Sequence, residues 1–360
     1  MIKKRKKAIS ELRSENLSQF QIKDVYRKMA VHNPLNQLEI GGIISGIKDG
    51  TISDNQIGAF LMGSVTNGLT NTEIGYIATS MQKAAIPIRP NITEPLIDVC
   101  GTGGGDITTF NISTANSLVA AAGGVYVAKH GSRSISSKSG GADVLEALGV
   151  KIDLRPRQIE KLIKTVGISF LYANNLHPVM GRVYGLELEL GIKSIFFTLI
   201  GPLINPAGTK RHVLGVYQSE LVDKMADVAN KIGFKHALIV HGVDGMDEIS
   251  PVGETMIAEV KDGKVETYTI TPEQFGMKRG QPEEISGNSP QYNAKVIRDV
   301  LEGREKGTKR NAVVLNAGAS FYVARKVDNL GDGVRMAAEV IDSGKAAQKL
   351  DELIERSNSV

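Results

Sequence analysis

Apolar residues recur at helical spacing over residues 20–81, and this segment lacks the strict alternation of a half-buried strand. Polar breaks at Asp49-Gly50 and Asn67-Gly68 divide it into short helices. The proline-rich piece over residues 86–91 then ends the helical pattern and is expected to be a hinge or linker. These features predict a small all-helical domain over residues 1–90.

After residue 91 the pattern changes to short β-branched runs, each followed by a glycine-rich turn and a helix. We expect strands at residues 96–100, 125–128, 237–240 and 312–315. Such alternation predicts an α/β domain over residues 91–360, in which helices flank a mostly parallel central sheet. Residues 157–190 have a helical pattern without a clear strand, and helices within 157–195 are expected to complete the small helical domain.

The composition is that of a globular protein with a large core, because 41% of the 360 residues are hydrophobic and 23% are charged. The net charge of +4 comes from 43 basic and 39 acidic residues, a balance that does not require nucleic acid as a partner. A single cysteine, Cys100, excludes an internal disulfide and a cysteine-built zinc site. We therefore expect a reducing, cytoplasmic location.

The apolar pattern indicates neither a signal peptide nor a membrane-spanning segment. The basic residues 3–7 are followed by charged residues instead of an apolar run, so we expect a solvated helical tip and no signal peptide. The longest apolar run, over residues 195–204, is interrupted by Gly201 and Pro202 and is too short to span a bilayer.

The segment DVCGTGGGDITTFNIST, residues 98–114, places four glycines and several hydroxyl side chains between a predicted strand and a predicted helix. Glycines let backbone N–H groups approach ligand oxygens, and a helix N-terminus adds unpaired N–H groups and a favourable dipole. With Ser113-Thr114 as the expected cap of a helix over residues 115–122, the segment favours a bound phosphate. It matches neither the dinucleotide fingerprint nor a P-loop, and a purely structural glycine turn is the alternative.

A second polar loop, residues 129–143, follows the next predicted strand. It contains three cationic side chains, one histidine and five serines before the next helix begins. Two such loops after consecutive parallel strands lie side by side at the carboxyl edge of the sheet, so we expect them to share one ligand. A flexible serine-rich surface loop is the alternative.

A third loop, residues 241–251, again follows a predicted strand and contains adjacent carboxylates, Asp247 and Glu248. Magnesium takes one or two protein carboxylates and completes its shell with waters and phosphate oxygens. Beside a phosphate-binding surface, this pair is a candidate magnesium site, and a solvated acidic turn is the alternative.

Together these loops resemble the anthranilate phosphoribosyltransferase family, which is related in fold to the pyrimidine nucleoside phosphorylases. The resemblance covers about residues 25–350 and rests on GTGG with TFNIST, KHGSRSISSKSGGADVLEALG, HPVM, GPLINPAG and DGMDEISPVG. It implies a small helical domain hinged to an α/β domain, and a homodimer formed through the helical domains. The implied reaction moves phosphoribose from phosphoribosyl pyrophosphate to an aromatic amine with Mg²⁺, and anthranilate is the expected acceptor in tryptophan biosynthesis.

The resemblance also implies site residues by position. The implied catalytic residues are Lys129 and His130, and the magnesium ligands are Ser113, Asp247 and Glu248. The implied contacts to phosphoribosyl pyrophosphate are Gly101, Thr102, Gly104, Gly105, Asp106, Thr109, Asn111, Ile112, Ser113, Thr114, Lys129, Gly131, Ser132, Arg133, Ser136, Ser137 and Gly141. The implied acceptor contacts are Gly101, His130, Ser132, His177, Met180, Tyr184, Glu187 and Pro202.

The chain departs from the family pattern at the acceptor position that matters most. The family's arginine for the acceptor carboxylate falls on Glu187, or on Leu188 when counted back from Gly201. Neither side chain can pair with a carboxylate, so either Arg182 or Lys193 replaces the arginine, or the acceptor is a neutral or cationic aromatic amine.

Two smaller departures concern the loops. Gly105 stands where the family has aspartate, with Asp106 one position later, and Ser132 stands where the family has asparagine. The remaining alternatives are a nucleoside phosphorylase and a non-enzymatic nucleic-acid-binding relative. The magnesium carboxylates and the mixed charges count against them.

Overall fold

The computed structural model describes residues 21–134, 138–192 and 196–360, and the chain divides into two compact units. The helical unit comprises Met1–Ala85 with His177–Ile200, and the sheet unit comprises Ile86–Leu176 with Gly201–Val360. The basic residues 3–7, expected to form a helical tip, lie outside the described residues. Among the described residues, no helix has both the length and the apolar character that crossing a membrane requires.

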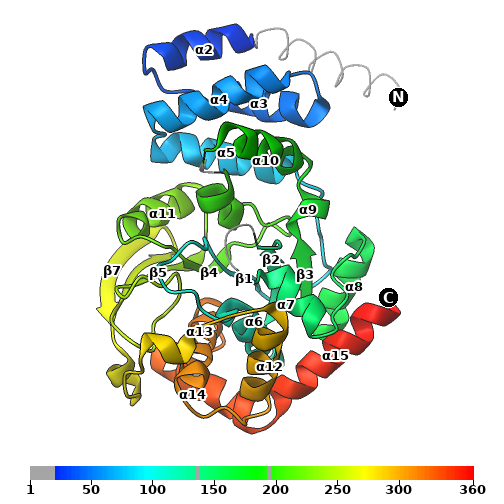
Figure 1. The fold of residues 1–360 in the computed structure, drawn as a ribbon, viewed down its shortest axis with the longest axis vertical. Coiled ribbons are helices and arrows are strands. Elements are labelled where there is room, and N and C mark those ends of the chain that lie inside the picture. Colours follow the sequence, from blue (N-terminus) through cyan, green and yellow to red (C-terminus); the bar gives the residue numbers. More distant parts are fainter. Residues whose placement is uncertain (1–20, 135–137, 193–195) are drawn as a thin grey trace. The chain divides into compact units, whose positions relative to one another are not determined.

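The helical unit combines helices that are distant in the sequence (Figure 1). It contains α2 (Ile22–Ala30), α3 (Gln37–Asp49), α4 (Asp54–Asn67), α5 (Asn71–Ala84), α10 (Pro178–Leu190) and a π-helical segment at Phe196–Ile200. Asn36, Ser53 and Thr70 start α3, α4 and α5 as capping boxes, which satisfy backbone N–H groups that the helix itself leaves unpaired. α10 packs on α3, α4 and α5, so the chain returns to this unit after passing through part of the sheet unit.

The sheet unit is built on one sheet, which has seven strands in the described part of the chain. The strands are β1 (Leu96–Gly101), β2 (Tyr126–Gly131), β3 (Ile168–Tyr172), β4 (Arg211–Gly215), β5 (His236–Gly242), β6 (Thr255–Lys261) and β7 (Lys264–Ile270). Their order is β3-β2-β1-β4-β5-β6-β7; the pairs from β3 to β5 are parallel, and β5-β6 and β6-β7 are antiparallel. The fold class predicted from the sequence is thus confirmed.

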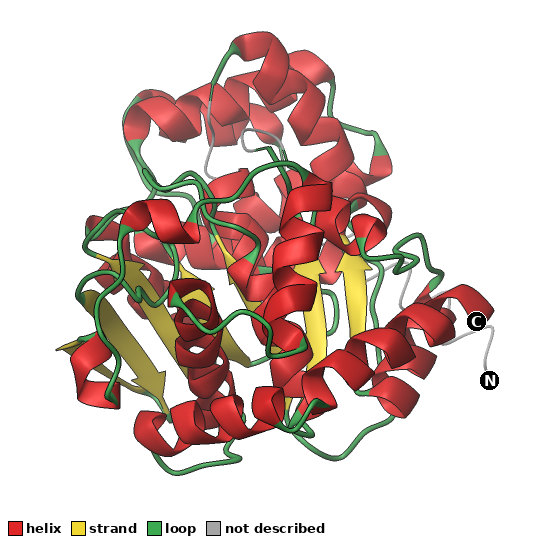
Figure 2. Cartoon of the chain, turned by 60° about the horizontal axis from the view of Figure 1, so that its bottom comes forward, coloured by secondary structure: helices red, strands yellow, loops and turns green. Residues whose placement is uncertain are grey.

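Helices of the same unit flank the sheet (Figure 2). They are α6 (Ile112–Ala122), α7 (Gly141–Ala147), α8 (Pro156–Val166), α9 (Ala173–Leu176), α11 (Glu220–Lys231), α12 (Pro290–Leu301), α13 (Thr308–Val323), α14 (Leu330–Asp342) and α15 (Lys345–Ser359). Of these, α6, α8, α9, α11 and α13 pack on the strands, and the others pack on these helices or on one another. Short 3-10 turns lie at Gly201–Leu203, Pro272–Phe275 and Pro282–Ile285.

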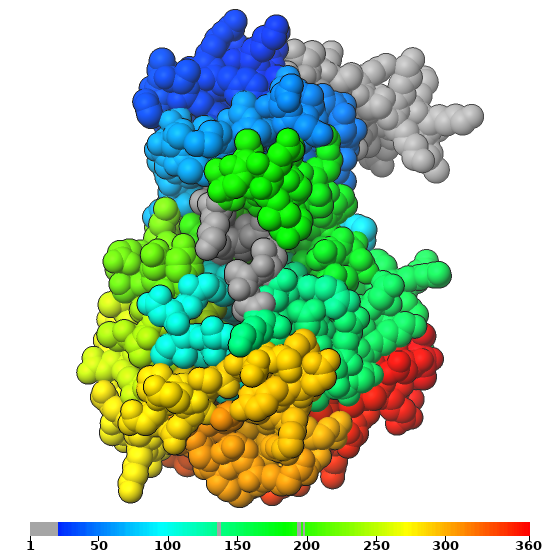
Figure 3. Space-filling view, viewed as in Figure 1, coloured from blue at the N-terminus to red at the C-terminus, as the bar shows by residue number. Residues whose placement is uncertain are grey.

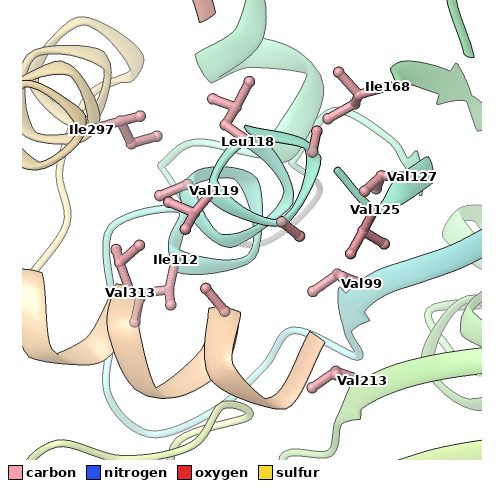
Figure 4. Close-up of a cluster of buried hydrophobic side chains, with 14 of the residues drawn as sticks. Val99, Ile112, Leu118, Val119, Val125, Val127, Ile168, Val213, Ile297 and Val313 are labelled. Atoms are coloured by element: carbon pink, nitrogen blue, oxygen red, sulfur yellow. The ribbon is translucent and has the colours of Figure 1, made fainter. Parts of the chain in front are cut away.

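The core of the sheet unit is centred on α6, whose small and aliphatic residues are buried along its whole length. Figure 4 shows Leu118 and Val119 of α6 among the side chains of Val99 from β1 and Val313 from α13. Burial of this apolar surface is the main favourable contribution to folding, and it fixes the direction in which α6 meets the end of β1. The start of α6 is thereby placed at the carboxyl edge of the sheet.

Two predictions of local structure were wrong, and one hairpin was missed. Residues 312–315, expected as a strand, lie inside α13, because a short apolar run cannot be distinguished from a buried helix by periodicity alone. Residues 157–190, expected to lack a strand, contain β3 between α8 and α10, and α8 belongs to the sheet unit. The β6–β7 hairpin was not predicted, although its Asp262-Gly263 turn, with φ angles of 48° and 84°, is a strong hairpin signal.

Candidate functional site

The loop after β5 crosses the carboxyl ends of two parallel strands. β1 ends at Gly101 and β4 ends at Gly215, and Asp247 lies against both glycines. A Cβ atom at Gly101 would lie 2.2 Å from Asp247 Oδ2, and a Cβ atom at Gly215 would lie 1.6 Å from the Asp247 backbone oxygen. Any side chain at either position would therefore displace the carboxylate loop.

The glycine-rich loop after β1 is bonded to the loop after β5. Gly103 donates its N–H to Asp247 Oδ2 at 2.8 Å, and Asp106 donates its N–H to the Gly245 oxygen at 3.0 Å. Gly103 and Gly104 have φ angles of 66° and 79°, a region that residues with a Cβ atom rarely adopt. The two loops predicted to bind phosphate and magnesium are thus one connected structure.

The departure from the family pattern at Gly105 has a structural reason. A Cβ atom at Gly105 would lie 2.5 Å from the Gly245 backbone oxygen, which is closer than such contacts allow. Asp106 follows one position later, next to Gly245, whose φ is 92°. The extra glycine lets the β1 loop lie directly on the β5 loop.

The outer side of the β1 loop borders the segment before α12. Thr109 forms an isolated β-bridge with Ser286, and Gly287 donates its N–H to the Thr108 oxygen at 2.9 Å. Figure 3 shows the β1 loop in cyan at the surface, beside the yellow segment. The loop is therefore supported on both sides, by the β5 loop and by residues 286–287.

The first turn of α6 begins earlier than predicted. Asn111 is the N-cap and Ile112 the first helical residue, so Ser113 and Thr114 lie in the first turn and do not form the cap. The Asn111 amide donates to the Ser139 oxygen at 3.0 Å and accepts from Ser139 Oγ at 3.1 Å. Thr114 Oγ1 is buried and has no hydrogen-bond partner among the described residues. The loops after β1 and β2 are thus joined at a helix N-terminus.

Lys129, on β2, is a buried cation that contacts both α6 and β1. Its Nζ donates to the Val99 oxygen at 2.9 Å and to Ser113 Oγ at 3.2 Å. Burial lowers the pKa of Lys129, whereas the negative charge of Asp98 acts in the opposite direction. The structure therefore places a positive charge beside a predicted magnesium ligand, Ser113.

Asp98, which was not selected from the sequence, is a fully buried carboxylate that ties the loops together. Its Oδ1 accepts the N–H groups of Val99 at 2.7 Å and His130 at 3.0 Å. Its Oδ2 accepts from Asn205 Nδ2 at 2.7 Å, and Asn205 also donates to the Ala128 oxygen at 2.8 Å. An acidic residue inside an apolar strand was the signal that could have identified it, because a buried carboxylate requires such partners.

Arg133 already has carboxylate partners on α7. Its guanidinium contacts Asp143 at 3.0 Å and Glu146 at 2.6 Å, and lies 5.8 Å from the centre of the Tyr172 ring. These hydrogen bonds raise the pKa of Arg133. A contact with a substrate phosphate would require Arg133 to exchange these partners.

The remaining predicted residues of the β2 loop lie near the start of α7. Gly131 ends β2, Gly141 begins α7, and Ser132 donates its hydroxyl to the Arg133 oxygen at 3.0 Å. Ser136 and Ser137 lie outside the described residues.

The half-buried Asp247 and the buried Glu248 form an acidic pair beside the start of α6. Burial raises the pKa of both carboxyls, and the charge of Asp247 further raises the pKa of Glu248, to about 8. The charge of Lys129 and a hydrogen bond from the Ser113 backbone act in the opposite direction. With Ser113 Oγ these carboxylates offer the hard oxygen ligands that Mg²⁺ prefers, and a cation would neutralise charge that burial disfavours. The residues present therefore fit a magnesium ion.

The predicted acceptor contacts fall in both compact units. His177, Met180, Tyr184 and Glu187 belong to the helical unit, whereas Gly101, His130, Ser132 and Pro202 belong to the sheet unit. Glu187 is 5% exposed on α10, and burial raises its pKa to about 7. Burial also lowers the pKa of His177, at the start of α10, to about 4.

Arg182, one of the two cations considered as a replacement for the family's arginine, is held within the helical unit. It donates to Asp54 Oδ1 at 2.6 Å, to the Ile47 oxygen at 3.0 Å and to the Ile52 oxygen at 3.3 Å. These partners connect α10 to the ends of α3 and α4. The other cation, Lys193, lies outside the described residues.

Cys100, Asp98 and His212 form a group whose donor atoms all lie within 4.8 Å of one another. Cys100 Sγ lies 3.3 Å from His212 Nε2, and burial raises the pKa of the thiol and lowers that of the imidazole. Both Asp98 oxygens already accept hydrogen bonds. The group is therefore a buried polar contact beneath the loops, separate from the predicted magnesium ligands.

Family models match both units of the chain. The α/β domain of a glycosyl transferase family matches residues 93–347, and the helical bundle domain of a glycosyl transferase family matches residues 23–85. These matches cover the loops described above and α2 to α5.

Known proteins with the same arrangement are anthranilate phosphoribosyltransferases. The chain is 46% identical to the one from Acetivibrio thermocellus, over 94% of this chain and 97% of that protein. The crystal structure of the Thermus thermophilus enzyme has a TM-score of 0.87 at 39% identity, over 93% of this chain and 99% of that one. The Saccharomyces cerevisiae enzyme, solved in complex with phosphoribosyl pyrophosphate and Mg, has a TM-score of 0.80 at 25% identity, over 90% and 93% of the chains.

Replacing Asp98 by asparagine should destabilise the sheet unit, because an amide cannot accept from both backbone N–H groups and from Asn205. We expect Asp98→Asn to lower the free energy of unfolding by about 1–3 kcal/mol in urea titrations followed by circular dichroism. The exposed Asp153→Asn is the control and should change the free energy of unfolding by less than about 0.5 kcal/mol. Equal effects of the two variants would contradict the role assigned to Asp98.

Proposed function

The chain belongs to the anthranilate phosphoribosyltransferase family of glycosyl transferases, and from this premise we propose that it transfers phosphoribose from phosphoribosyl pyrophosphate to anthranilate in tryptophan biosynthesis. One observation carries the proposal. A glycine-rich loop, the buried cation of Lys129 and the carboxylates of Asp247 and Glu248 meet at the carboxyl edge of one sheet.

Backbone N–H groups would hold the phosphates. Gly104 and Gly105 of the β1 loop carry no Cβ atom that would keep a phosphate away from their N–H groups, and the N-terminus of α6 adds a dipole that favours anions. The β2 loop, joined to α6 through Asn111 and Ser139, would close the other side.

Asp247, Glu248 and Ser113 would hold Mg²⁺, which the Saccharomyces cerevisiae relative binds together with phosphoribosyl pyrophosphate. When bound, the ion neutralises negative charge on the pyrophosphate. Lys129 lies 3.2 Å from Ser113 Oγ and would add a second positive charge near the same group.

The transfer forms a bond between the acceptor nitrogen and the anomeric carbon of ribose and breaks the bond from that carbon to pyrophosphate, while the amine loses a proton. Positive charge develops on the sugar in the transition state, as in glycoside cleavage. Lys129 would stabilise the negative charge that develops on the departing pyrophosphate, and His130 would orient the amine. Positioning and charge stabilisation suffice, so the protein needs no covalent nucleophile.

The helical unit would also form a homodimer. Val31, Leu38 and Leu188 are exposed apolar side chains of this unit, and such residues are common at interfaces between copies. The reducing conditions inferred from the single cysteine support a cytoplasmic location.

The activity is tested by pyrophosphate release from phosphoribosyl pyrophosphate with Mg²⁺ and anthranilate. Release should require all three components. Asp247→Asn should slow it at least about 100-fold, as expected when an electrostatic contact to the reacting group is lost. Asp153→Asn is the exposed control and should keep full activity. Absence of release by the unaltered protein, with anthranilate and with other aromatic amines, would contradict the proposal.

A second candidate function is favoured by Glu187. Counted from His177, this carboxyl stands at the position of the family's acceptor-binding arginine, with Leu188 as the alternative when counted back from Gly201. Arg182 already binds Asp54 and two backbone oxygens. A buried anion would repel an acceptor carboxylate. The alternative substrate is therefore a neutral or cationic aromatic amine, transferred by the same phosphoribosyl chemistry.

The pH dependence of the acceptor KM separates these candidates. Because burial raises the pKa of Glu187 to about 7, the carboxyl is neutral below this pH and anionic above it. The KM for anthranilate should rise about tenfold from about pH 6 to about pH 8, whereas the KM for a neutral amine should stay constant. Glu187→Gln should remove the rise, and Glu187→Arg should lower the KM at both pH values.

Glu189→Gln, an exposed change on the same helix, should leave the profile unaltered. Faster turnover of neutral amines than of anthranilate would favour the second candidate. A flat anthranilate profile that Glu187→Gln leaves unchanged would show that Glu187 does not act on the acceptor.

A further inference from the structure

A line of buried polar side chains crosses the apolar packing between α13, α6 and the loop after β5. Asn116 on α6 and Asn316 and Ser320 on α13 are all fully buried. Apolar residues surround them along both helices. Polar groups in such surroundings cost free energy unless their hydrogen bonds are made, so the contacts of these three side chains indicate what they do.

Asn316 binds the backbone of a single loop residue at two points. Its Oδ1 accepts the N–H of Ile249 at 3.0 Å, and its Nδ2 donates to the Ile249 oxygen at 2.9 Å. The same Nδ2 donates to the Ala312 oxygen at 2.9 Å, one turn earlier on α13. The Asn316 side chain thus pairs with both backbone groups of Ile249, as a neighbouring strand would. Because Ile249 directly follows Glu248, these bonds fix the backbone beside the acidic pair.

Ser320 continues the line toward the other side of the site. Its Oγ lies 2.8 Å from Asn116 Oδ1 and 3.3 Å from the Asn316 backbone oxygen. Asn116 is on α6, less than one turn after Ser113. The line therefore runs from the carboxylate loop, through α13, to the helix that carries the hydroxyl of the same candidate magnesium site.

α13 is itself held in place by α14, so it can act as a fixed support. A Cβ atom at Gly318 would lie 2.7 Å from the Val334 nitrogen, and one at Gly333 would lie 2.3 Å from the Gly318 oxygen. Contact this close leaves little freedom for one helix to slide along the other. A displacement of Asn316 relative to the sheet would require α13 and α14 to move together.

We propose that Asn316 is a positioning residue for magnesium-dependent substrate binding: it fixes Asp247 and Glu248 relative to Ser113, and Ser320 with Asn116 completes the connection to α6. This inference rests on the proposed function, because it assigns Mg²⁺ to these three ligands. Asn316 acts through the Ile249 backbone and does not itself touch the ion or the substrate.

Two measurements test the inference on the full-length protein. The first is amide hydrogen exchange of the peptide that contains Ile249, without metal. Asn316→Ala should increase exchange there at least about tenfold, because the Ile249 N–H loses its acceptor. The second is calorimetric binding of phosphoribosyl pyrophosphate at a series of Mg²⁺ concentrations, which needs no acceptor. The Mg²⁺ concentration for half-maximal binding should rise at least about tenfold in Asn316→Ala.

Three further variants distinguish a positioning role of Asn316 from a general loss of stability. Asn316→Ser, which retains a shorter hydroxyl and leaves a smaller gap, should show the same changes to a lesser degree and serves if Asn316→Ala does not fold. Ser320→Ala should raise the Mg²⁺ concentration for half-maximal binding while leaving hydrogen exchange at Ile249 nearly unchanged. Val323→Ala, at the end of α13, should lower the melting temperature without altering the Mg²⁺ dependence.

Wild-type exchange at Ile249 and wild-type Mg²⁺ dependence in a folded Asn316 variant would overturn the inference. Failure of the unaltered protein to bind phosphoribosyl pyrophosphate would instead overturn the proposed function, so the two failures are distinguishable.

Discussion

The site depends on one close approach, that of Asp247 to the ends of β1 and β4. The carboxylate and backbone of this residue occupy the space that a Cβ atom would fill at Gly101 and Gly215. Because of this approach, the Gly103 N–H reaches Asp247 Oδ2, and the phosphate-binding loop and the carboxylate loop become one surface. The strand order places β1 and β4 side by side, so this contact follows directly from the sheet topology.

Beneath that surface, buried charges of opposite sign balance one another. The negative charge of Asp98 stabilises the positive charge of Lys129. The charge of Lys129 in turn stabilises the anionic form of the Glu248 carboxyl. Asp98 in turn accepts hydrogen bonds from His130 on β2 and from Asn205, two residues far apart in the sequence. Burying an unpaired charge would be costly, so each of these groups limits the positions of the others. The result is a preorganised arrangement of charges suited to a pyrophosphate with its metal ion.

The sequence predicted the fold class and three of the strands, because apolar runs mark buried parallel strands and glycine-rich loops mark their ends. The prediction failed where an apolar run is compatible with both a buried strand and a buried helix. Residues 312–315 are such a run, and they are helical because they belong to the buried helix α13. The loops that meet at the sheet edge were also selected from the sequence. Asp98, Asn205 and Asn316 were missed, although each is a polar residue in an apolar segment, because their partners are distant in sequence.

The central claim is that the approach of Asp247 to Gly101 creates a site for phosphoribosyl pyrophosphate with Mg²⁺. Titration calorimetry of this substrate with the unaltered protein and with Gly101→Ala, each with and without Mg²⁺, tests it most directly. The account predicts binding at least about tenfold tighter with Mg²⁺ in the unaltered protein, and loss of this gain in Gly101→Ala, where the added Cβ displaces the carboxylate. Binding that is independent of Mg²⁺, or equal in the two proteins, would contradict it.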